Sequence, residues 1–147
     1  MSEFELGTDG PRVIVVGYDA TEPADHALAY ATGLARRQSA TLVVTFATPS
    51  YVMAAMGTTV DACLAGVGDS IQREVQQQVE SHLAGSGVKW KFVAGNGDPV
   101  RLLESVAKQS QADAVVVGHS RHREHRFVGS VAIRLVRSAK WPTIVVP

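Results

Sequence analysis

The sequence predicts an α/β fold: a single domain built on an open, doubly wound, five-stranded parallel sheet with helices on both faces. Five short runs of β-branched and aliphatic residues recur along the chain, each too apolar for a half-exposed hairpin strand. A segment with the spacing of an amphipathic helix separates each run from the next. This alternation is typical of right-handed crossovers that place helices on both faces of a parallel sheet. The 147 residues suffice for one such domain.

The first strand is expected at 12–17, where "RVIVVG" ends at a glycine. A helix follows, with Thr21 expected to cap it, Pro23 in its first turn and basic residues at its C-terminal end. Its apolar residues have helical spacing; they are Ala24, Ala27, Leu28, Ala31 and Leu34. The run "TLVVTFA" at 41–47 predicts a second buried strand.

The middle of the chain contains its least readable part. Residues 48–68 are small and apolar without a clean period, so a loop leading into a helix is expected there. From Ser70 the apolar spacing is helical, and "GSG" at 85–87 indicates the end of that helix. The alternating run "VKWKFVAG" at 88–95 predicts a third strand nearer a sheet edge.

The last third repeats the strand and helix pattern. Asp98 and Pro99 are expected to cap and begin a third helix, and "ADAVVVG" at 112–118 predicts a fourth buried strand. Ser130 is expected to cap a fourth helix. The fifth strand is "TIVV" at 143–146.

Composition narrows the class of function. Fourteen basic residues balance fourteen acidic ones, so no global field favours nucleic acid or an acidic membrane. Cys63 is the only cysteine and no apolar segment is long enough to span a bilayer, so a cytoplasmic protein is expected. Residues 1–11 are polar, Gly-punctuated and expected to be disordered, and "EFELGT" within them reads like translated cloning-site sequence. The domain is expected to span 12–147.

In sheets of this kind ligands bind at the C-terminal ends of the strands, where the winding reverses. The segments predicted to lie there are Gly17–Thr21, Phe46–Ser50, Gly95–Asp98 and Gly118–Ser130. The last of these holds three histidines and three arginines in "GHSRHREHRFVGS".

Three segments together resemble the universal stress protein family over residues 12–147: "VIVVGYDAT", "GDP", and "DAVVVGHSR" followed by "GSVAIRLVRSAKWPTIVV". The resemblance implies a Rossmann-like fold of the adenine nucleotide alpha hydrolase type and a stress-response role. Members that bind ATP carry Gly-x2-Gly-x9-Gly-Ser/Thr between the fourth strand and the fourth helix. Gly118 and Gly129-Ser130 match the ends of that pattern. Arg121 replaces its second glycine, and the spacer "HREHRFV" has seven residues instead of nine.

The resemblance implies a set of nucleotide-binding residues. Asp19 matches a position that contacts the adenosine part of ATP, and Phe46 a place where backbone groups meet adenine; the Phe46 side chain is expected in the core. Ser130, Val131 and their neighbours would offer amides to phosphate at a helix N-terminus. Each has a simpler interpretation, as a turn aspartate or a helix cap. For Gly97 and Asp98, turn and cap roles are favoured over a ribose contact. The implied set is Gly17, Asp19, Phe46, Gly118, Arg121, Gly129, Ser130 and Val131, with ATP and Mg²⁺ as ligand.

The basic loop leaves three interpretations. His119, His122 and His125 recur every third residue, but the interleaved arginines disfavour a dication, so no metal site is expected. Solvated surface charge is one alternative. Anion binding is the sharper one, with Arg121 reaching phosphate through a guanidinium that can bind in a bidentate manner.

The last strand, "TIVV", is short and bracketed by prolines, which is typical of a sheet edge. In relatives such a strand pairs antiparallel with its copy, so the resemblance implies a homodimer through Thr143, Ile144, Val145 and Val146. Trp141 is a candidate interface residue, with packing inside its own subunit as the alternative.

The favoured function is adenine-nucleotide binding in a stress response. One alternative is a nucleotide-free dimeric interaction module that has lost ATP binding through the altered loop. A slow nucleotide hydrolase is a third possibility and is less favoured, because no residue that would activate water stands out in the sequence.

Overall fold

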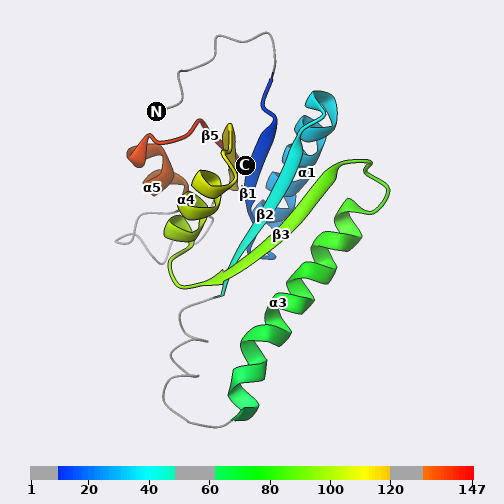
Figure 1. Cartoon of the computed structure of the whole chain (residues 1–147), viewed down its shortest axis with the longest axis vertical. Helices are drawn as coiled ribbons and strands as arrows, with labels where there is room; N and C mark the ends of the chain where they lie inside the picture. Colours follow the sequence, from blue (N-terminus) through cyan, green and yellow to red (C-terminus); the bar gives the residue numbers. More distant parts are fainter. Residues whose placement is uncertain (1–9, 49–61, 120–130) are drawn as a thin grey trace.

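The protein contains one five-stranded sheet, and every strand pair in it is parallel (Figure 1). The computed structural model describes residues 10–48, 62–119 and 131–147. The strands are β1 (Val13–Gly17), β2 (Thr41–Thr48), β3 (Lys89–Asn96), β4 (Ala114–Gly118) and β5 (Thr143–Val146). Their order in the sheet is β3-β2-β1-β4-β5. The predicted fold class and all five predicted strands are confirmed, and β3 and β5 are edge strands as expected.

Four helices of the described residues cover the sheet: α1 (Glu22–Gln38), α3 (Ala62–Leu83), α4 (Pro99–Gln109) and α5 (Val131–Ser138). Alternate residues of each strand point to opposite faces. Ile14 and Leu42 belong to a core cluster with α1 and α3, whereas Val15 and Val43 belong to a second cluster with α4 and α5. Both faces are therefore buried, which explains why the strands are apolar along their whole length.

The helix expected from Ser70 begins eight residues earlier, at Ala62. This prediction was wrong because Gly66 and Gly68 interrupt the apolar spacing, so the early turns have no readable period. The resulting helix is 22 residues long and extends beyond the C-terminal ends of the strands (Figure 1). Its predicted end is confirmed, since Gly85 and Gly87 follow it with positive φ. The expected loop at 49–61 lies outside the described residues.

Two predicted capping bonds are wrong in detail. Thr21 and Asp98 occupy the N-cap positions of α1 and α4, each followed by a proline in the first turn. Neither side chain makes an N-cap hydrogen bond, although the Val100 and Arg101 amides of α4 contribute to lowering the pKa of Asp98. The Thr21 hydroxyl donates instead to Asp19, and the Asp98 carboxylate accepts from Arg134. Thr21 thus closes a local turn, whereas Asp98 makes a tertiary contact with α5.

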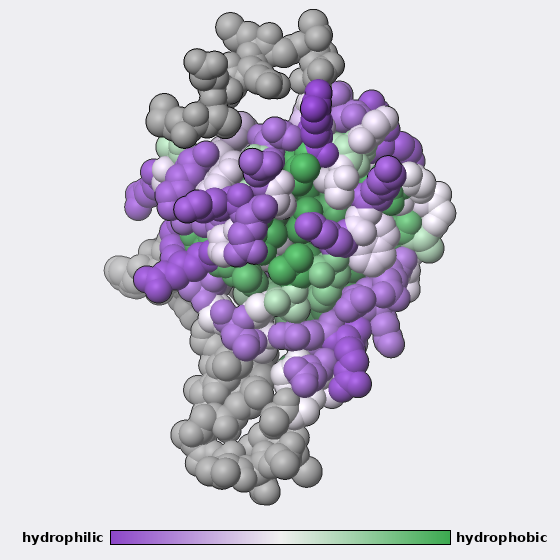
Figure 2. All heavy atoms as spheres, in the orientation of Figure 1, coloured by the Kyte–Doolittle hydropathy of each residue, from purple (hydrophilic) through white to green (hydrophobic). Residues whose placement is uncertain are grey.

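Hydrophobic and hydrophilic side chains are unevenly distributed over the surface. Figure 2 shows the hydrophobic colour gathered in the middle of one face, over the strands, with hydrophilic side chains around it. Trp90 and Phe92 of β3 are partly buried against the first core cluster. Near the opposite edge strand, β5, Trp141 is partly buried against the second cluster, which supports packing inside its own subunit.

Among the described helices, none is long and apolar enough to cross a membrane.

Candidate functional site: the crevice between β1 and β4

The winding of the sheet reverses between β1 and β4, which are neighbours in it. The chain leaves β1 through α1 toward β2 on one face, and leaves β4 toward α5 and β5 on the other face. The two connections thus lead to helices on opposite faces of the sheet, and such a reversal is where ligands bind in open α/β sheets. The segments that the sequence predicted there, Gly17–Thr21 and the start of Gly118–Ser130, therefore lie on neighbouring strand ends.

The turn after β1 is organised by Asp19. Its exposed carboxylate accepts a hydrogen bond from the Thr21 amide at 3.1 Å and another from the Thr21 hydroxyl. Ala20 between them has φ +61°, in the left-handed region, so this aspartate turn holds a strained position. The turn role that the sequence suggested for Asp19 is thus confirmed. The carboxylate stays exposed at the C-terminal edge of the sheet.

Gly118 is a glycine for a reason that the sequence did not suggest. A Cβ at this position would lie 2.4 Å from the Pro23 carbonyl oxygen and 3.0 Å from the Ala24 nitrogen. The end of β4 therefore packs directly on the backbone of the first turn of α1, and only a glycine fits. Gly17 is less restricted, because its Cβ would meet side-chain atoms of Leu103 and Val117 at 3.2 Å.

Phe46 lies near the end of β2, and its side chain is buried in the first core cluster together with Tyr18. The prediction that this side chain belongs to the core is confirmed. Thr48, at the last position of β2, is completely buried. Its hydroxyl oxygen accepts a hydrogen bond from Gln72 Nε2 of α3 at 2.9 Å. The end of β2 is thus covered by α3.

An ion pair that the sequence did not predict joins the starts of α4 and α5. Arg134 donates to both carboxylate oxygens of Asp98, at 2.7 and 2.6 Å. This bidentate hydrogen bond is the main reason that the pKa of Asp98 lies below its ordinary value. Gly97, with φ +95°, makes the turn that brings Asp98 into place. Turn and anchoring roles account for both residues. The pair also fixes the first turn of α5 beside that of α4.

A second polar cluster lies behind Asp19 and was also missed. The Tyr18 hydroxyl donates to Asp25 Oδ1 at 2.7 Å, and His82 Nδ1 of α3 lies 3.5 Å from the same oxygen. The Tyr18 and His82 rings meet edge to face with centroids 6.4 Å apart. Burial, and then the bond to Asp25, raise the pKa of Tyr18 well above its ordinary value. The cluster ties the end of β1 to both α1 and α3.

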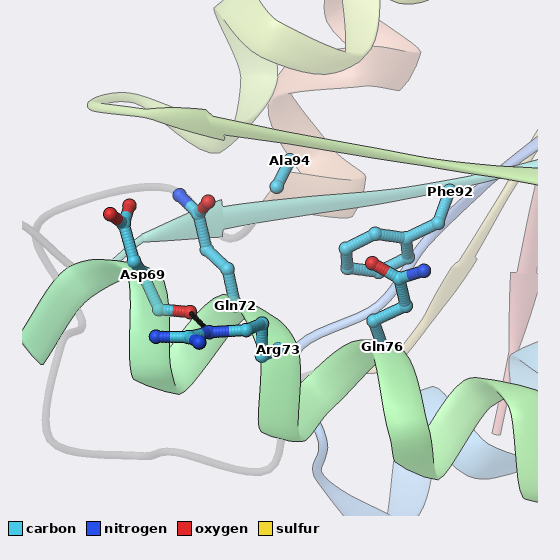
Figure 3. Close-up of a pocket in the computed structure, with 6 residues that line it drawn as sticks. All are labelled: Asp69, Gln72, Arg73, Gln76, Phe92 and Ala94. Carbon is cyan, nitrogen blue, oxygen red and sulfur yellow. Dashed lines mark hydrogen bonds between the residues drawn. The ribbon is translucent and has the colours of Figure 1, made fainter. Parts of the chain in front are cut away.

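A shallow groove of about 550 Å³ runs between α3 and the edge strand β3 (Figure 3). It is lined by four polar residues of α3 and by Phe92 and Ala94 of β3; the α3 residues are Asp69, Gln72, Arg73 and Gln76. Arg73 Nε donates to the Asp69 carbonyl of its own helix at 3.2 Å. Of the predicted nucleotide-binding residues that the structure describes, none lines this groove, so it is distinct from the switch point between β1 and β4.

Several predicted residues lie outside the described part of the chain: Arg121, His122, His125, Gly129 and Ser130. Val131 is the first residue of α5 and is partly buried, and His119 follows β4 directly, donating its amide to the Val146 carbonyl oxygen at 2.7 Å. Within residues 10–48, 62–119 and 131–147, no three histidine, cysteine or acidic side chains are grouped as a metal site requires.

The doubly wound parallel sheet, with its switch point between β1 and β4, defines a Rossmann-like α/β protein. A family model described as "Universal stress protein family" matches residues 11–147, so the chain belongs to that family. No curated protein sequence matches the chain.

Three solved structures illustrate the likeness. A universal stress family protein from Burkholderia pseudomallei is 26% identical with a TM-score of 0.71, covering 92% of this chain and 96% of that one. A universal stress protein in complex with cAMP is 21% identical with a TM-score of 0.73, covering 93% and 97%. One from Archaeoglobus fulgidus in complex with dAMP is 22% identical with a TM-score of 0.68, covering 91% and 96%. The last two likenesses concern the fold alone.

Proposed function

We propose that this protein binds an adenine nucleotide, with ATP and Mg²⁺ as the first ligand to test, in the crevice between β1 and β4. The observation that carries the proposal is the position of the Asp19 turn and the Gly118 strand end at the switch point of the sheet. Complexes of two family structures with cAMP and dAMP support the class of ligand.

The proposed contacts divide between the two ends of the nucleotide. The backbone near Gly17 and Phe46 would receive the base, and the exposed Asp19 carboxylate would accept from a ribose hydroxyl. The phosphates would meet Val131, which begins α5, together with Gly129 and Ser130, which precede it in the sequence, because the helix dipole there favours negative charge. Arg121 would supply a charged donor in place of a glycine. Gly118 would hold the strand end close to α1.

Calorimetry with ATP and Mg²⁺ at two salt concentrations tests this proposal, together with mass spectrometry of any nucleotide released on denaturation. Binding should weaken with salt, and Arg121→Ala should weaken it by about tenfold or more, the loss expected for one charged hydrogen bond. Arg36→Ala, at the far end of α1, is the matched control and should leave affinity unchanged. No released nucleotide and no heat of binding would contradict the proposal.

A second candidate function, a nucleotide-free interaction module of the same fold, is favoured by one observation. Gly118 is explained by its packing on Pro23 without any phosphate. This candidate predicts silent calorimetry together with an intact dimer, so the same measurements separate the two functions.

We further propose a homodimer that pairs β5 with β5 of a second copy. The Val115 amide donates to the Pro142 carbonyl and the His119 amide to the Val146 carbonyl. The backbone N–H and C=O groups of the even-numbered residues of β5 therefore point toward β4. The N–H and C=O groups of Thr143 and Val145 therefore point to the free edge. Val145→Pro removes an outward donor and should leave the inner ladder intact, whereas Val145→Thr keeps that donor. Light scattering should show a monomer for the first variant and a dimer for the second; a dimer for both would contradict this interface.

A further inference from the structure

The edge strand β3 presents a long row of backbone groups that no described strand bonds. Among the described residues it pairs with β2 alone, in an unbroken one-to-one register over its eight residues Lys89–Asn96. It contains neither a proline nor a bulge, two devices that often keep a sheet edge from pairing. At the opposite edge, β5 has only four residues and is bracketed by prolines. Of the two edges, β3 is thus the one that can pair with a longer segment.

The hydrogen bonds of β2 show which groups of β3 are free. The Thr41 amide donates to the Arg12 carbonyl, and the Thr45 carbonyl accepts from the Tyr18 amide. Odd-numbered residues of β2 therefore bond to β1, and its even-numbered residues bond to odd-numbered residues of β3. The N–H and C=O groups that point to the free edge consequently belong to Trp90, Phe92, Ala94 and Asn96.

The side chains of these same residues face the groove between α3 and β3. Trp90 and Phe92 pack on the core cluster that contains α3, so the alternation along β3 turns Ala94 to that side as well. Figure 3 shows Phe92 and Ala94 pointing from β3 toward α3, and Gln72 and Gln76 pointing from α3 toward the strand. Phe92 and Ala94 line the groove and are only partly buried. A strand added at this edge would therefore place alternate side chains in the groove, beside Phe92.

The opposite face of β3 is basic at its start. Val93 packs on the second core cluster, so the alternation places Lys89 and Lys91 on that face, and both lysines are exposed. Lysines at a sheet edge disfavour pairing with an identical strand, because like charges are brought together. They favour a partner strand whose side chains on this face are acidic. In the groove, the opposite charges of Asp69 and Arg73 leave apolar contact with Phe92 as the main attraction.

We propose that β3 binds an extended segment of another protein, in which acidic residues alternate with apolar ones, as an added strand of the sheet. Its backbone would bond to the outward groups of Phe92 and Ala94. Its acidic side chains would lie beside Lys89 and Lys91, and its apolar side chains would enter the groove. Figure 2 shows the hydrophobic colour over the strands framed by hydrophilic side chains, which fits such a partner. The surface is separate from the switch point between β1 and β4, so nucleotide binding there is not required.

Amide chemical shifts of the full chain test this surface during titration with the capped peptide Glu-Val-Glu-Val-Glu-Val-Glu. The amides of Trp90, Phe92 and Ala94 should shift together and saturate. Two control peptides should give no saturable shifts. One holds the same residues in blocks, Glu-Glu-Glu-Glu-Val-Val-Val, and the other keeps the alternation with lysine in place of glutamate.

Variants of β3 separate the backbone contribution from the charge contribution. Ala94→Pro removes an outward donor and should weaken peptide binding by about fivefold or more, whereas Ala94→Ser keeps that donor and should bind like the wild type. Lys91→Gln should weaken binding by up to about fivefold at low salt. Arg137→Gln, on α5 beside the opposite edge of the sheet, is the matched control and should leave affinity unchanged.

Each other outcome overturns the proposal. It is wrong if the alternating acidic peptide gives no saturable shift at about 1 mM, or if the block peptide binds equally well. It is also wrong if Ala94→Pro and Lys91→Gln both bind like the wild type; should Ala94→Pro fail to fold, Lys91→Gln alone decides. If the β3 amides shift with protein concentration when no peptide is present, the occupant is a second copy of this chain instead.

Discussion

Replacing Gly118 with alanine should destabilise the protein in the absence of any nucleotide. The new Cβ would lie 2.4 Å from the Pro23 carbonyl oxygen, and real Cβ contacts shorter than 3.0 Å are essentially never seen. The neighbouring atoms are backbone, so no rotamer change relieves the clash, and the first turn of α1 must move away from β4. Overpacking of this kind costs about 1–3 kcal/mol of unfolding free energy.

Gly33→Ala is the matched control for this change. Gly33 lies inside α1, and a Cβ there would meet nothing within 4 Å. Alanine should therefore stabilise the helix by about 0.5–1 kcal/mol. In thermal unfolding of the nucleotide-free protein, each kcal/mol shifts Tm by about 2–4 °C for a chain of this length. The Tm should fall for Gly118→Ala and rise for Gly33→Ala. An unchanged or raised Tm for Gly118→Ala would refute the packing explanation of this glycine.

Three further changes test the contacts around the crevice. Tyr18→Phe should lower the free energy of unfolding by about 1 kcal/mol, because it removes the hydroxyl bonded to Asp25. In an alkaline titration followed by tyrosinate absorbance, the variant should lack the contribution of Tyr18. Because the folded pKa of Tyr18 is raised, its contribution is complete below pH 10 and lost as pH rises further; equal alkaline sensitivity of wild type and variant would contradict this. Asp98→Asn should cost about 1 kcal/mol at neutral pH, a modest value because the Arg134 side chain is 39% exposed. The pKa of Asp98 is lowered, so the difference should vanish as pH falls below 3.8 and through the folded value; a constant difference would exclude the ion pair as its cause. Thr45→Val should leave stability unchanged or raise it by up to about 1 kcal/mol, since the buried Thr45 hydroxyl has no hydrogen-bond partner among the described residues, and a clear loss in denaturant unfolding would disprove that.

The fold could be predicted because its determinants are local. The apolar runs at β1, β2 and β4 are buried on both faces, so hydrophobicity alone marks them. The predicted ends and caps of helices were wrong where local signals in the sequence conflict. Gly66 and Gly68 concealed the first turns of α3, and Thr21 and Asp98 mark helix starts while bonding elsewhere.

The candidate site could be predicted only in part, because its contacts join distant segments. Strand ends are readable, so Asp19 and Gly118 could be placed at the crevice. The Asp98–Arg134 pair spans 36 residues, and no pattern in the sequence indicates which arginine of the last helix reaches back. His82 meets Tyr18 through the packing of α3 on the sheet, which depends on tertiary geometry. For Gly118, the family pattern pointed to phosphate, whereas packing on α1 already requires glycine.

Amide chemical shifts during an ATP–Mg²⁺ titration test nucleotide binding at the switch point most directly. The amides of residues 17–21 and of Gly118 and His119 should shift together and saturate. Amides beside the α3/β3 groove, at Gln72, Gln76 and Phe92, should stay in place. Shifts confined to that groove, or no saturable shifts at all, would contradict nucleotide binding at the switch point.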